Sequence, residues 1–408
     1  LYGMHWPYKQ HKTSRDQKIL PYHDELKKAG ACFGQSGEYE RPMWFALDGT
    51  KPEYEYSFNY QNWYPSVDRE SKNTIENVGL FELSPFSKYE VKGKKAYEEL
   101  QRLCTANIKN EIGKCTYTQM LNEEAGIETD LTVICLEKDH YRIISSAVVR
   151  THDKAHIIKH LSNDLEFRDV TDELICLGVF GPKSRELLSK ITDENLTNEK
   201  FRFGFGKNIK LGLINVWAQR LSYVGELGYE IYAKVEDALE IYKLIVNTGK
   251  EFKLSHCGAH TMDTMRMESG FLHWGHDISP EDNQYQAGLD FAISYKKKFN
   301  FIGKEKLLEI KNHKLNKRFV MLYLKDSNPG NPLMLHEEPI YLENHIIGKT
   351  TSGNYSFNYN VNLSFGYIHS KFTNEELVKK ELYIEIEKKK YPVNLMLKPL
   401  KQSNYKDS

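Results

Sequence analysis

The stretch NEEAGIETDLTVICLEKDHYRIISS, residues 122–146, sets the pattern from which the fold can be worked out. Its apolar segments LTVIC and IISS flank the turn-forming DHYR, so it predicts two buried β-strands. Glu128 and Asp130 stand directly before the first strand. Side chains two residues apart on a strand point the same way, so a backbone extended from Glu128 onward places both carboxylates on one face. The pattern leaves two interpretations open: a solvated strand entrance, or a carboxylate that takes part in chemistry.

Helical and strand-like segments mix irregularly around this stretch. Apolar spacing predicts an amphipathic helix over residues 95–108. GLINVWAQRLSYVGELGYEIYAK, residues 212–234, has the pattern of two strands around a turn. Further helical patterns cover residues 151–162, 235–252 and 259–272. The strict alternation of a doubly wound sheet is missing, so we expect an α+β fold with mixed or antiparallel sheets.

Strand-like segments replace the helical patterns from about residue 318. They include KRFVMLYLK at 317–325, LSFGYIHS at 363–370 and ELYIEIEKKKYPVNLML at 381–397. Such a run predicts a small all-β barrel or sandwich. We therefore expect an α+β region over residues 71–310 and a C-terminal β-barrel domain over residues 311–408.

Residues 1–70 differ from both regions because they are rich in aromatic residues, Pro and Gly. Only a stretch at about residues 22–30 has a helical pattern. A long wrapped loop is one interpretation. The many Trp and Tyr side chains have to be buried, however, which favours a connector that packs against a neighbouring domain.

The composition excludes several classes of protein. The 408 residues hold 56 Lys and Arg against 56 Asp and Glu, so no basic excess supports a nucleic-acid partner. No stretch approaches the roughly 18 apolar residues of a membrane span. The six scattered cysteines form no CxxC pair and favour reduced thiols. We expect a cytoplasmic protein, or one of the mitochondrial matrix if eukaryotic, with no membrane partner.

Common cofactor and metal motifs are missing from the sequence. It contains no GxGxxG after a strand, no GxxxxGK[ST] and no HExxH. The pair of histidines in HWGH, residues 273–276, has a spacing that a metal site can use. A turn with hydrogen-bonding histidines is the commoner outcome, so no metal site is expected.

Four motifs in fixed order give a resemblance to a known family. They are GIETDLTV at 126–133, FGPKSRELL at 180–188, RLSYVGELGYEIY at 220–232 and GFLHWGHDISPED at 270–282. The chain resembles the folate-binding C-terminal half of FAD-dependent sarcosine and dimethylglycine dehydrogenases. That half is similar to the glycine cleavage T-protein, an aminomethyltransferase. FIGKEKLL at 301–308 and EPIYLENHIIGKTTSGNY at 338–355 extend the resemblance into the β-rich end.

The N-terminal segment favours the dehydrogenase group over stand-alone T-proteins within this family. HWPYKQ at 5–10, YHDELKKAGACFGQSGEYERPMWFA at 22–46 and YEYSFNYQNW at 54–63 resemble the segment that joins the flavin domain to the folate domain. Stand-alone T-proteins lack that segment. The flavin-binding half is absent from this sequence, and the first residue is Leu, so we expect a processed chain or a piece of a longer protein.

The resemblance assigns the catalytic role to Asp130. In this family the aspartate before LTV acts as acid and base near the N5 and N10 nitrogens of folate. Such a carboxylate steadies a cationic intermediate and takes the proton that N10 loses when the methylene bridge closes. Many T-proteins have a second acidic residue directly before it, where this chain has Thr129. We therefore expect Asp130 to act alone.

The hairpin at residues 220–232 matches the family's pterin-recognition motif. Tyr223 corresponds to the tyrosine that packs on or hydrogen-bonds the pterin ring. Glu230 corresponds to the glutamate that accepts two parallel N–H donors from the pterin edge. Gly225 and Gly228 are expected to let the backbone turn beside a flat ligand. Glu226 is a competitor of Glu230, but its position at a turn favours an exposed side chain.

Other expected ligand contacts are less direct. Ser84 and Lys88 are expected to line the folate site, although Lys88 is equally compatible with a surface strand. Trp274, and with less support His273, are expected to form a wall of the site. Met262 stands where T-proteins have an arginine that contacts folate. The resemblance therefore leaves the cations for the folate glutamate tail unnamed.

The resemblance implies a one-carbon transfer enzyme. A flavin half, in the same chain or in a separate subunit, would bind FAD and oxidise an N-methylated amine. This half would bind tetrahydrofolate and trap the one-carbon unit as 5,10-methylenetetrahydrofolate. One alternative is a stand-alone aminomethyltransferase or folate-dependent demethylase. The other is a regulatory or scaffold relative without activity, which the presence of Asp130 and Glu230 disfavours.

Overall fold

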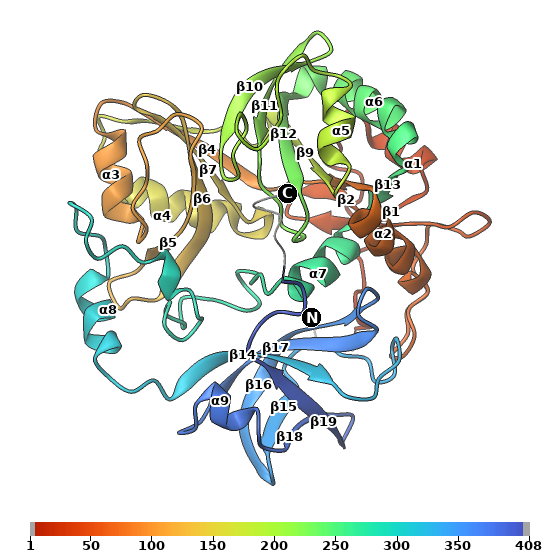
Figure 1. Ribbon diagram of the computed structural model, residues 1–408, viewed down its shortest axis with the longest axis vertical. Helices are drawn as coiled ribbons and strands as arrows, with labels where there is room; N and C mark the ends of the chain where they lie inside the picture. The colour runs from red at the N-terminus through yellow and green to blue at the C-terminus, as the bar shows by residue number, and fades with distance from the viewer. Residues whose placement is uncertain (1–4, 403–408) are drawn as a thin grey trace.

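A five-stranded antiparallel sheet with two covering helices forms one side of the molecule (Figure 1). Its strand order is β5-β6-β7-β4-β8. The strands are β4 (Ser87–Lys92), β5 (Cys115–Leu121), β6 (Ile127–Glu137), β7 (His140–Ser145) and β8 (Glu166–Asp169). Helices α3 (Ala96–Leu103) and α4 (Arg150–His160) cover its outer face. Their apolar sides share one buried cluster with Tyr89, Leu131 and Ile143, so this face of the sheet is closed.

A six-stranded mixed sheet forms the other side. Its order is β10-β11-β12-β9-β3-β13, and only β13 and β3 run parallel. The strands are β3 (Val78–Glu82), β9 (Leu174–Phe180), β10 (Gly206–Leu211), β11 (Ile214–Gln219), β12 (Gly228–Lys234) and β13 (Leu254–Cys257). Helices α1 (His23–Lys28), α5 (Ser184–Ser189) and α6 (Ala238–Gly249) pack on its outer face. Short 3-10 helices lie at Ala147–Val149, Val235–Asp237, Lys250–Phe252 and Asp290–Ala292.

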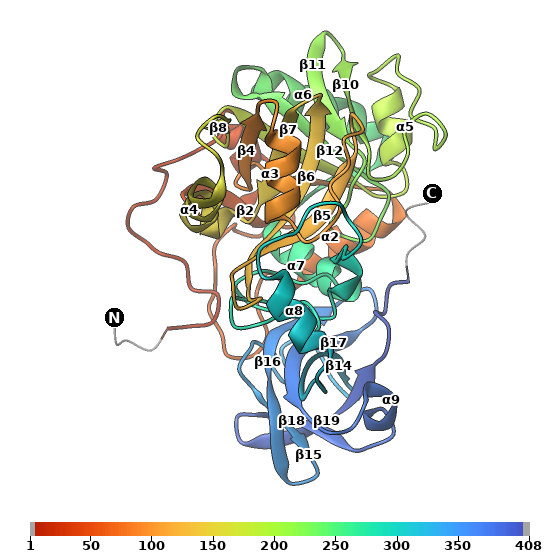
Figure 2. The same cartoon turned by 90° about the vertical axis from the view of Figure 1, so that its left-hand side faces the viewer.

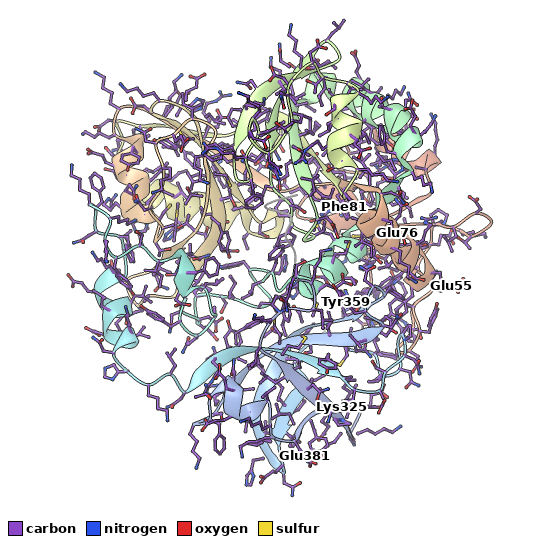
Figure 3. The ribbon with its side chains drawn as sticks, in the orientation of Figure 1. Glu55, Glu76, Phe81, Lys325, Tyr359 and Glu381 are labelled. Carbon is purple, nitrogen blue, oxygen red and sulfur yellow. The ribbon has the colours of Figure 1, made fainter. Side chains whose placement is uncertain are left out.

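The inner faces of the two sheets meet in a shared apolar cluster. Ile134 on β6 of the first sheet belongs to the same cluster as Tyr232 on β12 of the second. Phe81 of β3 is another member and lies near the middle of the molecule in Figure 3. The α+β architecture expected from the sequence is therefore confirmed as two helix-covered sheets that face each other.

A closed six-stranded barrel lies below the two sheets (Figures 1 and 2). Its order is β14-β17-β16-β15-β18-β19, which confirms the expected C-terminal barrel. The strands are β14 (Lys317–Leu324), β15 (Pro339–Leu342), β16 (His345–Ser356), β17 (Val361–His369), β18 (Leu382–Ile386) and β19 (Lys389–Met396). Helix α7 (Ala259–Glu268) lies between the barrel and the sheets, and contacts β16, β17 and β2. Helices α8 (Lys304–Lys311) and α9 (Asn374–Leu377) complete this region.

The computed structural model describes residues 5–402, so residues 1–4 and 403–408 of the expected end segments lie outside it. The N-terminal segment is more regular than expected. It forms a hairpin of β1 (Ala31–Ser36) and β2 (Tyr39–Phe45), followed by helix α2 (Tyr64–Glu76). A boundary at residue 70 falls inside α2, so it has no break in the chain to support it. The division of the chain into domains remains a prediction.

Aromatic residues of this N-terminal segment are buried within the chain itself. Trp44 and Trp63 are each 1% exposed and share a cluster with Tyr355 and Phe357 of the barrel region. The Trp63 ring also stacks on His260 of α7, with 4.0 Å between ring centroids. The segment therefore joins the sheets to the barrel through α7.

The cysteines and the helices can also be compared with the expectations from the sequence. All six cysteines are free and buried. Among the helices of residues 5–402, none combines the length and apolar character needed to cross a membrane.

Candidate functional site

Asp130 lies on the inner face of the five-stranded sheet. Strand β6 begins at Ile127, so Glu128 and Asp130 already have extended backbone and share one face, as the alternation predicts. Asp130 pairs with Gln119 of β5 across the strands. Gln119 donates from Nε2 to Asp130 Oδ1 over 2.7 Å. This amide is the neutral donor that holds the carboxylate in place.

Burial sets the chemical character of Asp130. It raises the pKa of the carboxyl to about 6, while the Gln119 amide and the Tyr117 phenol oppose that shift. The carboxyl is therefore mostly ionised at pH 7 and close to the midpoint of proton transfer. A group in this range suits an acid–base role near neutral pH.

Glu128 has a different environment from Asp130 on the same face. Its carboxylate accepts hydrogen bonds from Asn122 Nδ2 at 2.9 Å and His152 Nε2 at 3.1 Å. His152 is 41% exposed in its side chain. Glu128 is therefore held by protein donors at the edge of the sheet. That Asp130 acts alone stays a prediction.

Glu230 lies on the inner face of the six-stranded sheet. Its position in β12 places it opposite Gln219 of β11 and Gly178 of β9. The Tyr232 hydroxyl donates to Glu230 Oε2 over 2.6 Å. Burial raises the pKa of Glu230, and both Tyr232 and the charge of Lys88 oppose the shift. Nε2 of Gln219 is buried without a hydrogen-bond partner beside it.

Lys88 lies on the inner face of the five-stranded sheet, and its charge acts on Glu230 of the other sheet. Register places it opposite Ile144, which lies opposite Thr132, so Lys88 shares a face with Asp130. It is fully buried, and its Nζ donates to the carbonyls of Ser84 and Phe86, each over 2.7 Å. Burial lowers its pKa to about 8. The alternative of a surface strand residue is therefore wrong, because these carbonyls replace the solvent around the ammonium.

Ser84 is buried and occupied by protein groups. Its hydroxyl accepts from the Cys176 backbone N–H over 2.9 Å and lies 3.2 Å from the Tyr22 hydroxyl. These contacts give the side chain a structural role. Any effect on a ligand would pass through the Ser84 carbonyl that holds Lys88.

Tyr223 lies in the loop between β11 and β12. Its hydroxyl donates to the Leu272 carbonyl over 2.7 Å, and its ring stacks on Phe271 at 5.7 Å. Burial raises the pKa of Tyr223, and the charge of Asp130 adds to that effect. The phenol and the catalytic candidate are therefore electrostatic neighbours.

The two glycines of this motif have different roles. Gly225 has φ of +73°, and a Cβ there would meet Ser269, so this position requires glycine. Gly228 is already the first residue of β12, and its backbone is outside the left-handed region. The expected turn role of Gly228 is wrong, because close packing against Phe180 is what excludes a side chain there. Glu226 forms an ion pair with Lys401.

Trp274 and His273 lie beside the start of β6. The Trp274 indole donates to the carbonyl of Ile127, the first residue of β6, over 3.0 Å. The His273 backbone N–H donates to Asp277 over 3.0 Å. Burial lowers the pKa of His273 to about 4, so its imidazole is neutral at pH 7. Within residues 5–402, no group of three or more His, Cys, Asp or Glu could hold a metal ion.

Charged residues of α7 join the sheets to the barrel. Arg266 forms ion pairs with Asp263 at 2.9 Å and with Asp277 at 2.6 Å, and donates to Ser352 of β16. Glu268 accepts from Ser356 over 2.6 Å. These charges are fully partnered by the protein, which marks the junction as structural.

A pocket of about 320 Å³ opens beside Tyr117. It is lined by Ala106, Asn107, Thr116, Tyr117, Phe291, Ala292, Ile293 and Ser294. Tyr117 and Gln119 were missed in the sequence analysis. Their positions two apart on CTYTQML, the strand next to β6, were the available signal, but the pairing of the two strands had to be known to use it.

Comparison with known protein families covers most of the chain. The model of the GCVT N-terminal domain matches residues 22–297, and that of the glycine cleavage T-protein C-terminal barrel domain matches residues 317–401. The 4-methylaminobutanoate oxidase (formaldehyde-forming) of Paenarthrobacter nicotinovorans is 38% identical over 357 residues, covering 87% of this chain and 43% of that protein. Mitochondrial dimethylglycine dehydrogenase of Rattus norvegicus is 34% identical over 382 residues, covering 92% and 43%.

The chain thus spans less than half the length of these two curated relatives. Among solved structures, the aminomethyltransferase T of the glycine cleavage system from Bartonella henselae superposes with a TM-score of 0.81 at 23% identity. The superposition covers 95% of this chain and 99% of that one. The resemblance inferred from the four motifs is therefore confirmed. The chain belongs to the glycine cleavage T-protein family, within which its relatives include N-methyl amine dehydrogenases and aminomethyltransferases.

Proposed function

We propose that this chain binds tetrahydrofolate between its two sheets and is the one-carbon transfer half of a sarcosine- or dimethylglycine-dehydrogenase-type enzyme. The observation that carries the proposal is the pair of partly exposed carboxylates, Asp130 and Glu230, on facing inner surfaces. Each is held by one or two neutral donors and has no cationic partner within ion-pair distance among the described residues. Both therefore retain capacity for a ligand.

Glu230 suits the edge of a pterin ring. A carboxylate can accept two parallel N–H donors, and only Oε2 of Glu230 is occupied, by Tyr232. The unpaired amide of Gln219 directly opposite supplies a donor for a carbonyl of the same ring. Tyr223 and Phe271 form an aromatic pair nearby. Lys88, Trp274 and His273 complete the proposed contacts.

Asp130 suits the reacting end of the ligand. Bound tetrahydrofolate would supply the two nitrogens that accept a one-carbon unit. Asp130, with a pKa raised to about 6 by burial, can take the proton that one of these nitrogens loses. Gln119 fixes the orientation of the carboxylate during that step. The product would be 5,10-methylenetetrahydrofolate.

A flavin-binding partner would supply the one-carbon unit. The chain covers 43% of the length of relatives named as an oxidase or dehydrogenase of N-methylated amines. We propose that the remaining part binds FAD and oxidises a small N-methylated amine. It would act from the same polypeptide or from a separate subunit.

A second candidate is a stand-alone aminomethyltransferase or folate-dependent demethylase. The observation in its favour is the fold match over 99% of an aminomethyltransferase chain. The N-terminal hairpin and α2 pack on α7. Activity of this chain without any flavin partner would select this candidate.

Calorimetric titration with tetrahydrofolate tests the proposal. Wild-type chain should bind in the micromolar range, and Glu230→Gln should weaken binding about 10- to 100-fold, as expected for a lost charge-assisted hydrogen bond. Glu226→Gln is the matched control, because Glu226 lies in the same motif and pairs with Lys401 instead. A folded wild-type chain that binds no tetrahydrofolate would contradict the proposal and leave the scaffold alternative.

A further inference from the structure

Arg41 of β2 is a buried guanidinium with few acceptors. The residue is 8% exposed. Its Nε donates to the Glu82 carbonyl over a long 3.3 Å, and its Nη2 lies 3.6 Å from the Met262 sulfur. A guanidinium has five N–H donors, and a thioether is a weak acceptor. Within residues 5–402, no carboxylate forms an ion pair with Arg41.

Two other buried arginines have the partners that Arg41 lacks. Arg266 is 2% exposed and contacts two carboxylates, of Asp263 and Asp277. Arg142 is 8% exposed and donates to Glu90 over 2.7 Å. The fold therefore pairs these buried guanidinium groups but leaves Arg41 unpaired at equal depth.

Glu82 and His260 are the titratable groups that interact with the charge of Arg41, and neither forms an ion pair with it. Oε1 of Glu82 accepts from the Tyr22 hydroxyl and the Ser84 N–H, and its Oε2 is buried without a hydrogen-bond partner. The Glu82 charge partly offsets the fall in the Arg41 pKa that burial causes, but the two side chains form no ion pair. Burial raises the pKa of Glu82, and the charge of Arg41 opposes that shift. His260 also faces Arg41, and burial lowers its pKa to about 4, so it is neutral at pH 7.

The position of Arg41 connects it to the inner surfaces of the two sheets. Its guanidinium carbon lies 5.8 Å from the centre of the Phe86 ring. Phe86 and Met262 both pack in the apolar cluster that contains Tyr223 and Tyr232. Lys88 is held by the Phe86 carbonyl. Arg41 therefore borders the region that holds the proposed folate contacts.

We propose that Arg41 binds a carboxylate of the ligand at this site, an inference that rests on the proposed function. Burying a charge without a partner is costly, and an anionic ligand would remove that cost when bound. The planar guanidinium fork matches a carboxylate with two parallel hydrogen bonds. Two ligands could supply the carboxylate: the glutamate part of tetrahydrofolate, or the amino-acid group of the oxidised amine that the flavin partner would deliver.

Arg41→Met separates ligand binding from a structural role. Methionine is apolar and of similar length, so the exchange removes an unpaired buried charge while it largely fills the space. If Arg41 serves a ligand, the melting temperature should stay the same or rise. A large fall in melting temperature, restored by Arg41→Lys with no change in ligand affinity, would overturn the proposal in favour of a structural cation.

The binding test uses three ligands with wild-type chain, Arg41→Met and Arg168→Met. Arg168 pairs with Glu173 and is half exposed, so it controls for the loss of a positive charge. The ligands are tetrahydrofolate, 6-methyltetrahydropterin, which has the ring without glutamate, and sarcosine added to the pterin-bound chain as a stable analogue of the oxidised amine. Glu230→Gln serves as the reference for loss of the ring site.

The outcomes distinguish the two ligand sources. A 10- to 100-fold loss of tetrahydrofolate affinity in Arg41→Met, with unchanged pterin affinity, assigns Arg41 to the glutamate part. Unchanged tetrahydrofolate affinity with loss of sarcosine binding assigns it to the amine. Wild-type affinity for all three overturns the proposal but leaves the folate site intact. No pterin binding by the folded wild-type chain overturns both this proposal and the proposed function.

Discussion

Buried charges occur in two regions of this molecule, and their partners differ. At the junction of α7 with the barrel, Arg266 is enclosed by the carboxylates of Asp263 and Asp277. On the inner surfaces of the sheets, the charged groups proposed for ligand binding have only neutral partners. Asp130 has an amide, Glu230 a phenol and Lys88 two carbonyls. We expect the paired charges of the junction to hold the fold, and we propose that the inner-surface charges bind a ligand.

The largest effect is expected at the junction. Asp277 accepts from Arg266, Thr351, Ser352 and the His273 backbone, so Asp277→Ala leaves Arg266 with an incomplete set of acceptors. The free energy of unfolding should fall by about 3–5 kcal/mol, as for other broken buried ion pairs. Urea unfolding followed by circular dichroism measures it. Glu281→Ala, an exposed acidic residue of the same loop, should change it by less than about 0.5 kcal/mol. Equal losses of unfolding free energy in Asp277→Ala and Glu281→Ala would contradict a special role of the junction charges in stability.

A large effect on activity with none on the fold is expected at Asp130. Asp130→Asn keeps the shape and the contact with Gln119, but it removes the proton acceptor. Formation of methylenetetrahydrofolate, assayed with the flavin partner present, should fall by about 10²-fold or more, the scale of a lost general base. Asn122→Asp, at the partner of Glu128 on the same sheet edge, is the control and should leave the rate within a few-fold of wild type. A similar loss in both variants would mean that general electrostatics, and not the proton acceptor, is responsible.

The pH dependence of Asp130 sharpens this prediction. Burial raises its pKa to about 6, so the folded state binds the proton more tightly than the unfolded chain does. Its contribution to stability is therefore least favourable above pH 6 and improves as pH falls toward 4. Asp130→Asn should exceed wild type in stability by about 1–3 kcal/mol at pH 7, and this gap should close by about pH 4. The transfer rate should fall as pH drops below about 6. A gap that is independent of pH would contradict the raised pKa.

The smallest effect on binding is expected at Ser84. Its hydroxyl is bonded to the Cys176 backbone N–H and lies near Tyr22, within the protein. Ser84→Ala should lower the free energy of unfolding by about 1–2 kcal/mol, because a buried N–H loses its acceptor. Tetrahydrofolate affinity should stay within about twofold of wild type. A tenfold loss of affinity would return Ser84 to the ligand contacts expected from the sequence.

The sequence was sufficient for the parts of the fold that follow local periodicity. The alternation in GIETDLTV correctly predicted that Glu128 and Asp130 share a face, and the strand-rich end correctly predicted the barrel. Helix α2 was missed because its buried side includes the polar residues Glu70, Ser71 and Thr74. Glu70 is stabilised by the Phe45 and Gly258 backbone N–H groups and by Thr261, and such distant partners leave no periodic signal.

The candidate site was predictable only in part for a similar reason. Motif resemblance named Asp130 and Glu230, whereas the roles of their neighbours depend on register between strands. Gln119 and Gln219 enter the site because β5 pairs with β6 and β11 with β12. Arg41 borders this region because the N-terminal hairpin packs beside Met262. No local pattern in the sequence reports these distant contacts.

The most direct test of the account is a crystal structure of the chain with tetrahydrofolate. We expect the pterin edge to lie against Glu230, the N5 and N10 atoms to face Asp130, and the ion pairs of Arg266 to be unchanged. In that complex, the ligand should supply the hydrogen-bond and charge partners that Asp130 and Glu230 lack in the protein alone. A ligand bound elsewhere, or a bound ligand that leaves Asp130 and Glu230 with only their present protein partners, would contradict it.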